Sequence, residues 1–206
     1  PRIEWPLMRD NITGSDLLAL TMFLQMGKFP GDPGPSLAPM GGIPRLTNGH
    51  QVQAFEEEFA QWLGSKYAVM VNSGSSANLL TMAAIAQMFG PGEVLVPCIT
   101  WVSDISAVLH AGLKPVFVDV DPRTLGMSLE DAARKVTKST RAVFPTHCLG
   151  FDAGINPKGI PLVEDCCEAL GAYRDGKKLG TFGLASNFSF YYAHHMSTIE
   201  GGMICT

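Results

Sequence analysis

The sequence has no apolar run that approaches the roughly 20 residues of a membrane span, so no membrane-embedded segment is expected. It also has no basic excess. Its 15 Lys and Arg residues stand against 19 Asp and Glu, the formal net charge is -4, and the two signs are interspersed. This balance argues against a nucleic-acid partner and against attachment to a membrane surface.

Cysteines are few, and their spacing is not that of a metal site. The five are Cys98, Cys148, Cys166, Cys167 and Cys205, an odd number without any C-x-x-C pair. A zinc ribbon and a thioredoxin-type site are therefore not predicted. Most of these cysteines stand in apolar, strand-like surroundings, so we expect reduced thiols in a core and a cytoplasmic protein. The first residues do not have the pattern of a signal peptide.

The sequence does contain a regular alternation of predicted strands and helices. Apolar residues make up 46% and charged residues 17% of the 206 positions, which is typical of a globular chain with a sizeable core. We predict an α/β fold, with a mostly parallel central sheet and helices on both faces. Strands are predicted at 67–71, 93–96, 114–120, 142–145, 161–163 and 187–190, and helices at 50–63, 75–89, 103–109 and from 128 to 133.

Two regions are predicted from the change of rhythm near residue 47. Residues 1–46 form an N-terminal segment with one helix, capped by Ser15, and a Pro/Gly-rich loop at 29–44. Residues 47–206 form the main domain. The loop is too apolar for a simple flexible linker, so we expect it to cover a site or to pack on a partner.

The first candidate site is the turn between the strand at 67–71 and the helix after it. Gly74 permits a tight turn, while Ser75 and Ser76 add hydroxyl groups to the free backbone amides of a helix start. Such a cup binds anions, and a phosphate fits it. An ordinary serine N-cap is the alternative. The motif is neither a Walker loop nor G-x-G-x-x-G.

Two further candidates follow predicted strands, at the edge where open α/β sheets bind ligands. Trp101 can stack on a flat ring there, and a position in the core is the alternative. Asp165 ends a buried strand and needs a partner, either a protonated ring nitrogen or a helix N-terminus. His147 and Cys148, at another strand end, either line the site or pack in the core.

The densest group of reactive side chains follows Ser189 and ends in Gly-Gly at 201–202. Two adjacent histidines, His194 and His195, stand behind aromatic residues in this stretch. Imidazoles are suited to a place where a proton must move near neutral pH. We expect His194 to do this and His195 to orient or to pack.

In this order, the motifs resemble the large domain of the DegT/StrS-type sugar aminotransferases, fold-type-I enzymes that use pyridoxal phosphate (PLP). The resemblance covers residues 6–206. It implies that the Ser-rich turn and Ser189 bind the cofactor phosphate, that Trp101 stacks on the pyridine ring and that Asp165 binds the pyridinium nitrogen. Glu168 is implied near the cofactor hydroxyl. The implied cofactor-binding set is Gly74, Ser75, Ser76, Trp101, Asp165, Glu168 and Ser189.

One departure from the family pattern is informative. The aminotransferases form a Schiff base through a lysine that precedes Gly-Glu-Gly-Gly, whereas this sequence has His194 at that place and Ile199 for the first glycine. A histidine forms no stable imine, but it acts as a general base and acid. The exchange is similar to that in the nucleotide 4-keto-6-deoxysugar 3-dehydratases, which keep the cofactor as pyridoxamine phosphate (PMP). The resemblance implies that His194 is catalytic and moves a proton at the cofactor C4′ atom while the sugar loses its C3 hydroxyl.

The resemblance also implies a pathway and partners. We expect a homodimer with shared active sites, acting on a nucleotide sugar in deoxysugar and lipopolysaccharide biosynthesis. PMP is regenerated either with glutamate as amino donor or through a [2Fe-2S] cluster, for which Cys167 is the candidate ligand. A sugar aminotransferase of the same family and a non-catalytic module that binds cofactor or nucleotide sugar stay open. Because the family's chains are longer, this one is expected to stop before the small domain.

Overall fold

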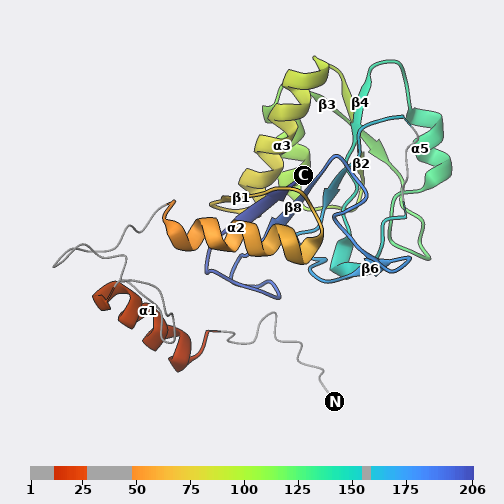
Figure 1. Ribbon diagram of the computed structural model, residues 1–206. Coiled ribbons are helices and arrows are strands. Elements are labelled where there is room, and N and C mark those ends of the chain that lie inside the picture. Colours follow the sequence, from red (N-terminus) through yellow and green to blue (C-terminus); the bar gives the residue numbers. More distant parts are fainter. Residues whose placement is uncertain (1–11, 27–47, 155–158) are drawn as a thin grey trace. The chain divides into compact units, whose positions relative to one another are not determined.

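The computed structural model describes residues 12–26, 48–154 and 159–206 (Figure 1). Contacts divide the chain into two units, residues 1–55 and 56–206. The Pro/Gly-rich loop predicted at 29–44 lies outside the described residues. Within the described ranges, no helix combines the length and the apolar character that crossing a membrane requires.

The first unit contains helix α1 (Gly14–Met26), where a helix was predicted. The helix start is held by a reciprocal pair: the Thr13 N–H donates to Asp16 Oδ2 at 2.7 Å, and the Asp16 N–H donates to Thr13 Oγ1 at 3.4 Å. This is a capping box. The predicted cap, Ser15, was wrong and lies inside the helix, because the acid that completes the box stands three residues after Thr13 and not after Ser15.

Helix α2 (His50–Leu63) has the predicted bounds and runs into the second unit. There its apolar positions Phe59, Ala60 and Leu63 are buried. The Phe59 ring packs edge-on against two aromatic rings, with centroid distances of 5.1 Å to Phe188 and 5.5 Å to Phe190. The three- and four-residue spacing of its apolar side chains thus fixes α2 beside the strand that carries Phe188.

The second unit is built on a central sheet whose strands meet in two sets, in the orders β3-β2-β4 and β5-β8-β9-β1. Parallel bridges from Val143 to Leu162 and from Thr146 to Asp165 join the two sets between β4 and β5. All neighbours in the sheet are parallel except β9, which runs antiparallel to both β8 and β1. The strands are β1 (Ala68–Val71), β2 (Glu93–Pro97), β3 (Lys114–Val118), β4 (Thr140–Val143), β5 (Val163–Asp165), β8 (Ala185–Ser189) and β9 (Gly202–Cys205).

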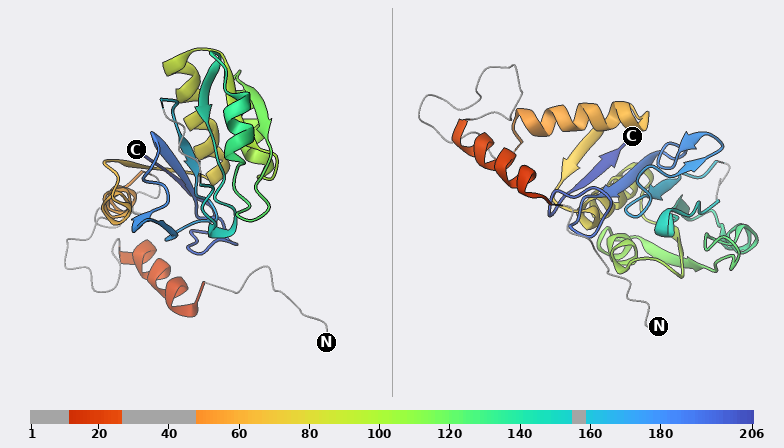
Figure 2. Two further views of the ribbon diagram at one scale, coloured as in Figure 1. Left: turned by 90° about the vertical axis from the view of Figure 1, so that its right-hand side faces the viewer. Right: turned by 90° about the horizontal axis from the view of Figure 1, so that it is seen from below.

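Helices cover both faces of this sheet (Figures 1 and 2). On one face, α3 (Gly74–Phe89) and α4 (Val102–His110) pack on a core that includes Val94 and Val96 of β2. On the other face, α5 (Leu129–Lys135) packs on a core that includes Leu95 of the same strand. Alternate residues of one strand therefore enter two different cores, as the pleat requires. The connections also hold the hairpin of β6 (Tyr173–Arg174) and β7 (Lys177–Lys178) and the short η1 turn (Cys148–Gly150).

The predicted fold class is confirmed, with some shifted boundaries. The strand predicted at 142–145 begins at Thr140, and the one predicted at 161–163 begins at Val163 and runs to Asp165. The observed strands include polar residues, Thr140 and Arg141 in β4 and Glu164 and Asp165 in β5, so an apolar run alone does not mark where ladder pairing starts or ends. Strand β9 was missed, because the Gly-Gly pair at 201–202, whose second residue begins the strand, is typical of a turn, and because its pairing depends on two other strands, one of them distant in sequence.

Candidate active site

The start of α3 offers hydrogen-bond donors to an anion. Ser73 is the N-cap, and its Oγ accepts the Ser76 N–H at 3.1 Å. The amides of Gly74 and Ser75, at the first positions of the helix, have no acceptor within it. A hollow of about 190 Å³ lies at this point between α3 and α4, lined by Ser75, Ser76, Ser103 and His110 among others. The serine N-cap is therefore Ser73, while Ser75 and Ser76 line the hollow. Their binding of an anion stays a prediction.

Two glycines allow distant segments to meet behind this helix start. A Cβ built on Gly74 would lie 2.7 Å from Ser189 Cβ and 2.8 Å from Cys167 Sγ. A Cβ built on Gly202 would lie 2.4 Å from the carbonyl carbon of Ser73. The ends of β5 and β8 and the start of β9 thus converge on the turn before α3. This brings together three residues singled out from the sequence, namely Gly74, Cys167 and Ser189.

Asp165, at the end of β5, is 2% exposed. Its Oδ1 accepts the Cys167 N–H at 2.8 Å, a turn that an aspartate forms with the residue two positions on. Its Oδ2 receives the Asn78 amide at a long 3.4 Å. The described residues give this carboxyl neutral donors and no Lys, Arg or His partner within ion-pair distance. Its weakly bonded Oδ2 therefore fits a ring N–H, while its role as a cofactor contact stays a prediction.

His194 lies in the loop between β8 and β9. Its Nδ1 is 3.3 Å from the backbone oxygen of Ser189. Because a carbonyl oxygen only accepts, Nδ1 carries the hydrogen of the neutral ring and the basic lone pair is on Nε2. The ring also stands edge-on to Tyr191, at a centroid distance of 5.9 Å. The His194 imidazole therefore lies in the loop that directly follows Ser189, the residue that approaches Gly74 in space. His195, by contrast, is exposed.

The loop that carries His194 is closed by backbone pairs. The Tyr192 N–H donates to Ile199 O at 2.9 Å, and the Thr198 N–H donates to Phe190 O at 3.0 Å. Ile199 has a φ of 71°, which is a strained conformation for a β-branched residue. The family pattern noted above has glycine at this place. The backbone conformation explains that preference, since glycine adopts a positive φ freely.

Trp101 and Glu168 lie in two different segments, one directly before α4 and the other after β5. Trp101 precedes α4 and is 68% exposed, which excludes the core alternative and leaves its ring open for stacking. Glu168 Oε2 accepts the Leu149 N–H at 2.9 Å, so this carboxylate ties the η1 turn to the segment after β5. Their contacts with a cofactor stay predictions.

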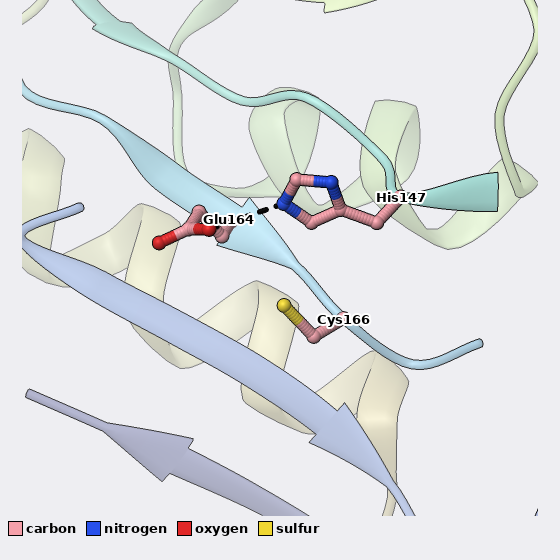
Figure 3. A group of neighbouring side chains, drawn as sticks. All are labelled: His147, Glu164 and Cys166. Carbon is pink, nitrogen blue, oxygen red and sulfur yellow. Dashed lines mark hydrogen bonds and ion pairs between the residues drawn. The ribbon is translucent and has the colours of Figure 1, made fainter. Parts of the chain in front are cut away.

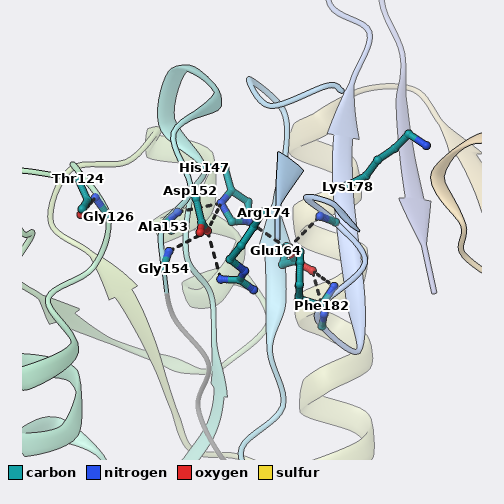
Figure 4. Close-up of polar contacts among 12 residues, drawn as sticks. Thr124, Gly126, His147, Asp152, Ala153, Gly154, Glu164, Arg174, Lys178 and Phe182 are labelled. Atoms are coloured by element: carbon teal, nitrogen blue, oxygen red, sulfur yellow. Dashed lines mark hydrogen bonds and ion pairs between the residues drawn. The ribbon is translucent and has the colours of Figure 1, made fainter. Parts of the chain in front are cut away.

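His147 belongs to a buried network rather than to the site (Figure 3). The Ala153 N–H donates to its Nδ1 at 3.1 Å, so Nε2 carries the hydrogen and donates to Glu164 Oε2 at 3.1 Å (Figure 4). Cys166 lies close enough for the three to form a metal-binding group geometrically. Against this, burial raises the pKa of the Cys166 thiol well above its usual range, and His147 has a hydrogen-bond partner at each ring nitrogen.

Glu164 confirms that this network is structural. Its carboxylate also accepts the N–H groups of Gly180, Phe182 and Gly183, at 2.9, 2.7 and 2.8 Å. Burial raises its pKa, but the bonds from His147 and from the Gly180 amide outweigh burial and leave the pKa below its usual value. An ionised carboxylate with four donors therefore fastens the turn at 180–183 to β5, and the core alternative for His147 is the one found.

Sequence reasoning missed a second buried acid beside Asp165. Asp104, in the first turn of α4, is fully buried, as is Asn78 of α3. The Asn78 amide nitrogen is 2.7 Å from Asp104 Oδ1, and its oxygen accepts from Asn187 Nδ2 at 2.9 Å. An acid in the first turn of a helix that otherwise has small and apolar residues and one histidine was the available signal.

The strand order and the helices on both faces of the sheet are those of the large domain of fold-type-I, PLP-dependent enzymes, and solved structures of this type share the fold. The chain belongs to the DegT/DnrJ/EryC1/StrS aminotransferase family, whose model matches residues 43–206. The family resemblance predicted from the sequence is confirmed.

Three similar proteins illustrate the family. A GDP-4-keto-6-deoxy-D-mannose 3-dehydratase from Yersinia pseudotuberculosis is 40% identical over 173 residues, 78% of this chain and 44% of that protein. A GDP-perosamine synthase from Vibrio cholerae is 38% identical over 165 residues, 77% of this chain and 45% of that protein. A structure of GDP-4-keto-6-deoxymannose-3-dehydratase with a trapped PLP-glutamate geminal diamine has a TM-score of 0.81 and 33% identity, covering 98% of this chain and 51% of that one. The chain spans about half the length of these relatives or less.

Proposed function

We propose that the full-length protein is a PMP-dependent 3-dehydratase that removes the C3 hydroxyl of a nucleotide-linked 4-keto-6-deoxyhexose. The observation that carries the proposal is His194, a base with its lone pair on Nε2, at the place of the family's lysine. The 40% identity to a 3-dehydratase of such a sugar supports it.

The described residues fit the cofactor that this reaction needs. When bound, PMP supplies an amine that condenses with the C4 ketone and a ring that takes up electrons. We propose that the amides of Gly74 and Ser75 and the hydroxyls of Ser76 and Ser189 bind the phosphate. Asp165, ionised, accepts the ring N–H and keeps the ring nitrogen protonated. Trp101 covers the ring face and Glu168 lies near the ring hydroxyl.

His194 is the residue that moves the proton. We propose that Nε2 takes a proton from the cofactor C4′ carbon and that the resulting imidazolium protonates the departing C3 hydroxyl. An imidazole is suited to both steps, because its usual pKa is near neutral pH. The Ser189 carbonyl stabilises the Nδ1–H side of the ring in both protonation states, so the ring orientation is kept while Nε2 gains and loses its proton.

The test is to incubate the full-length protein with PLP, reduce it with borohydride and measure its intact mass. We expect no covalent increment for the wild type and a cofactor increment for His194→Lys, which is the positive control. An increment in the wild type would support the aminotransferase alternative, which the 38% identity to a GDP-perosamine synthase favours. A folded protein that retains neither PLP nor PMP would favour a non-catalytic module.

Regeneration of PMP by glutamate is favoured over an iron–sulfur cluster. The similar 3-dehydratase structure with a trapped PLP-glutamate geminal diamine supports this choice. We expect glutamate to convert the bound cofactor to PMP, seen by its absorption, in protein without iron. A stoichiometric cluster in the purified protein would contradict this and assign Cys167 to it.

The proposed setting is a homodimer in the cytoplasm, in deoxysugar and lipopolysaccharide biosynthesis. Exposed apolar side chains on α3 and α4 and just before α4 support a subunit contact beside the site: Leu79, Leu80, Trp101, Val102 and Leu109. All five cysteines are free thiols, in keeping with a reducing compartment. Light scattering of the full-length protein tests the dimer, and a monomer at micromolar concentration would contradict it.

A further inference from the structure

The proposed function leaves Asp104 without a role, although its carboxyl is among the most enclosed in the second unit. It is fully buried on α4, and the described residues place no Lys, Arg or His within ion-pair distance of it. Its Oδ1 accepts the Asn78 amide at 2.7 Å. Its Oδ2 contacts the hydroxyls of Thr100 and Thr146, at 2.5 and 2.8 Å.

The two threonines also contact each other, with 2.5 Å between their hydroxyl oxygens. Three oxygens, those of Thr100, Thr146 and Asp104 Oδ2, therefore form a closed triangle of hydrogen-bonding distances. Two hydroxyl groups supply two hydrogens for three contacts. A hydrogen on the Asp104 carboxyl completes the ring, because each oxygen then donates once and accepts once.

The same carboxyl faces Asp165. The Asn78 amide nitrogen lies 2.7 Å from Asp104 Oδ1 and 3.4 Å from Asp165 Oδ2, so one neutral group bridges the two acids. Asn187 fixes the orientation of this amide, because its Nδ2 donates to Asn78 Oδ1 at 2.9 Å. The bridging side chain can then offer only N–H groups to the acids.

We propose that Asp104 and Asp165 form a buried pair that binds one proton, with Asp104 as the neutral member and positioning residue that leaves the single negative charge on Asp165. This inference rests on the proposed function for the role of that charge, which is to accept the ring N–H of the cofactor. Two ionised carboxylates this close and this deeply buried repel each other, and one proton removes the repulsion. Asp104, by holding the proton, thus keeps the net charge of the Asp104–Asp165 pair at minus one.

Other groups around the pair agree with this assignment. Burial and the Asp165 charge raise the pKa of Asp104 well above its usual range. From the segment after β5, the Cys167 thiol also faces the pair, and its raised pKa keeps it neutral. On the η1 side, burial and the charges of Glu168 and Asp165 raise the pKa of Cys148. None of these neighbours supplies a positive charge that would ionise Asp104.

The test compares the pH dependence of unfolding for the full-length wild type and Asp104→Asn, without cofactor. Asparagine copies the shape and neutrality of a protonated aspartate. If the native pair holds one proton that the unfolded chain releases above about pH 4, the unfolding equilibrium constant of the wild type rises about tenfold per pH unit relative to the variant between pH 5 and 7. A ratio that stays constant over this range overturns the proposal.

Cofactor affinity supplies the second readout and separates the two proposals. With PLP as the probe, we expect Asp104→Asn to bind within about threefold of the wild type and Asp165→Asn to bind at least tenfold more weakly. A loss of affinity in Asp104→Asn as large as in Asp165→Asn overturns the neutral role of Asp104. Failure of the wild type to bind PLP refutes the proposed function instead, and the pH ratio still decides whether the pair holds a proton.

Should Asp104→Asn not fold, infrared spectroscopy of the wild type keeps the proposal falsifiable. We expect the carbonyl stretching band of a protonated carboxylic acid at pH 7, shifted in heavy water. Its absence overturns the proposal.

Discussion

Gly202→Ala tests the convergence of β9 with the helix start that forms the anion cup. The added methyl would lie 2.4 Å from the carbonyl carbon and from the carbonyl oxygen of Ser73, and 2.7 Å from the Gly74 nitrogen. All three are backbone atoms, so no side chain can rotate away. Overpacking of this kind costs about 1–3 kcal/mol, and we expect the upper end of that range, because the Ser73–Gly74 turn and β9 must separate.

The same displacement moves the amides that are proposed to bind the cofactor phosphate. We therefore expect urea unfolding of the full-length protein to show a loss of about 3 kcal/mol and PLP titration to show weaker binding. The matched control is Gly14→Ala, because a Cβ there has no atom within 4 Å and should be neutral or slightly stabilising in a helix. If Gly202→Ala matched this control in both measurements, the close approach described here would be refuted.

Three further predictions concern stability. Glu164→Gln should cost about 3–5 kcal/mol in urea unfolding at pH 7. Because the folded pKa of Glu164 is lowered, the difference from wild type should shrink as the pH falls from the unfolded value of about 4.3 through the folded pKa, and a difference independent of pH would contradict this. Ile199→Gly should raise stability by up to about 1 kcal/mol, since relief of a positive φ outweighs the entropy of glycine; a lower melting temperature would show that the loop is not strained. The pKa of Asp131 is lowered to about 2, first by the Asp119 N–H and then by Lys135. In thermal melts Asp131→Asn should therefore be less stable than wild type above about pH 4 and equal to it near pH 2. Equal melting temperatures at pH 7 would refute this.

The sheet and its covering helices follow from local patterns. Helix α2 has the predicted bounds because its apolar residues keep helical spacing, and β2 was placed because Val94, Leu95 and Val96 form a run that two cores share. Strand β9 could not be placed in this way. Its backbone pairs with β1 and β8, which lie far apart in the sequence, and its first residue is a glycine required by the Ser73 backbone.

The candidate site likewise contains residues that local sequence patterns indicate and residues that only contacts through space reveal. Asp165, the last residue of β5, was singled out because parallel strands end at a common edge, whereas Ser189, the last residue of β8, was singled out through the family resemblance. Asp104 was not, since its significance comes from Asn78 and Thr146, which reach it through space from other elements. His147 was left open for the same reason, and only the Ala153 amide and Glu164 on its two ring nitrogens decide its place.

The contrast between histidine and lysine at position 194 follows from the number of nitrogens. An imidazole has two, so in the proposed reaction Nδ1 can remain bonded to the Ser189 carbonyl while Nε2 exchanges a proton. A lysine has one nitrogen, which either donates to that carbonyl or reacts with the cofactor aldehyde. The anchored ring therefore favours repeated proton transfer at a fixed point, and a lysine favours covalent attachment. The acceptor for Nδ1 is the Ser189 backbone oxygen, which no side-chain substitution removes. His194→Lys therefore changes the reactive group and leaves its surroundings in place.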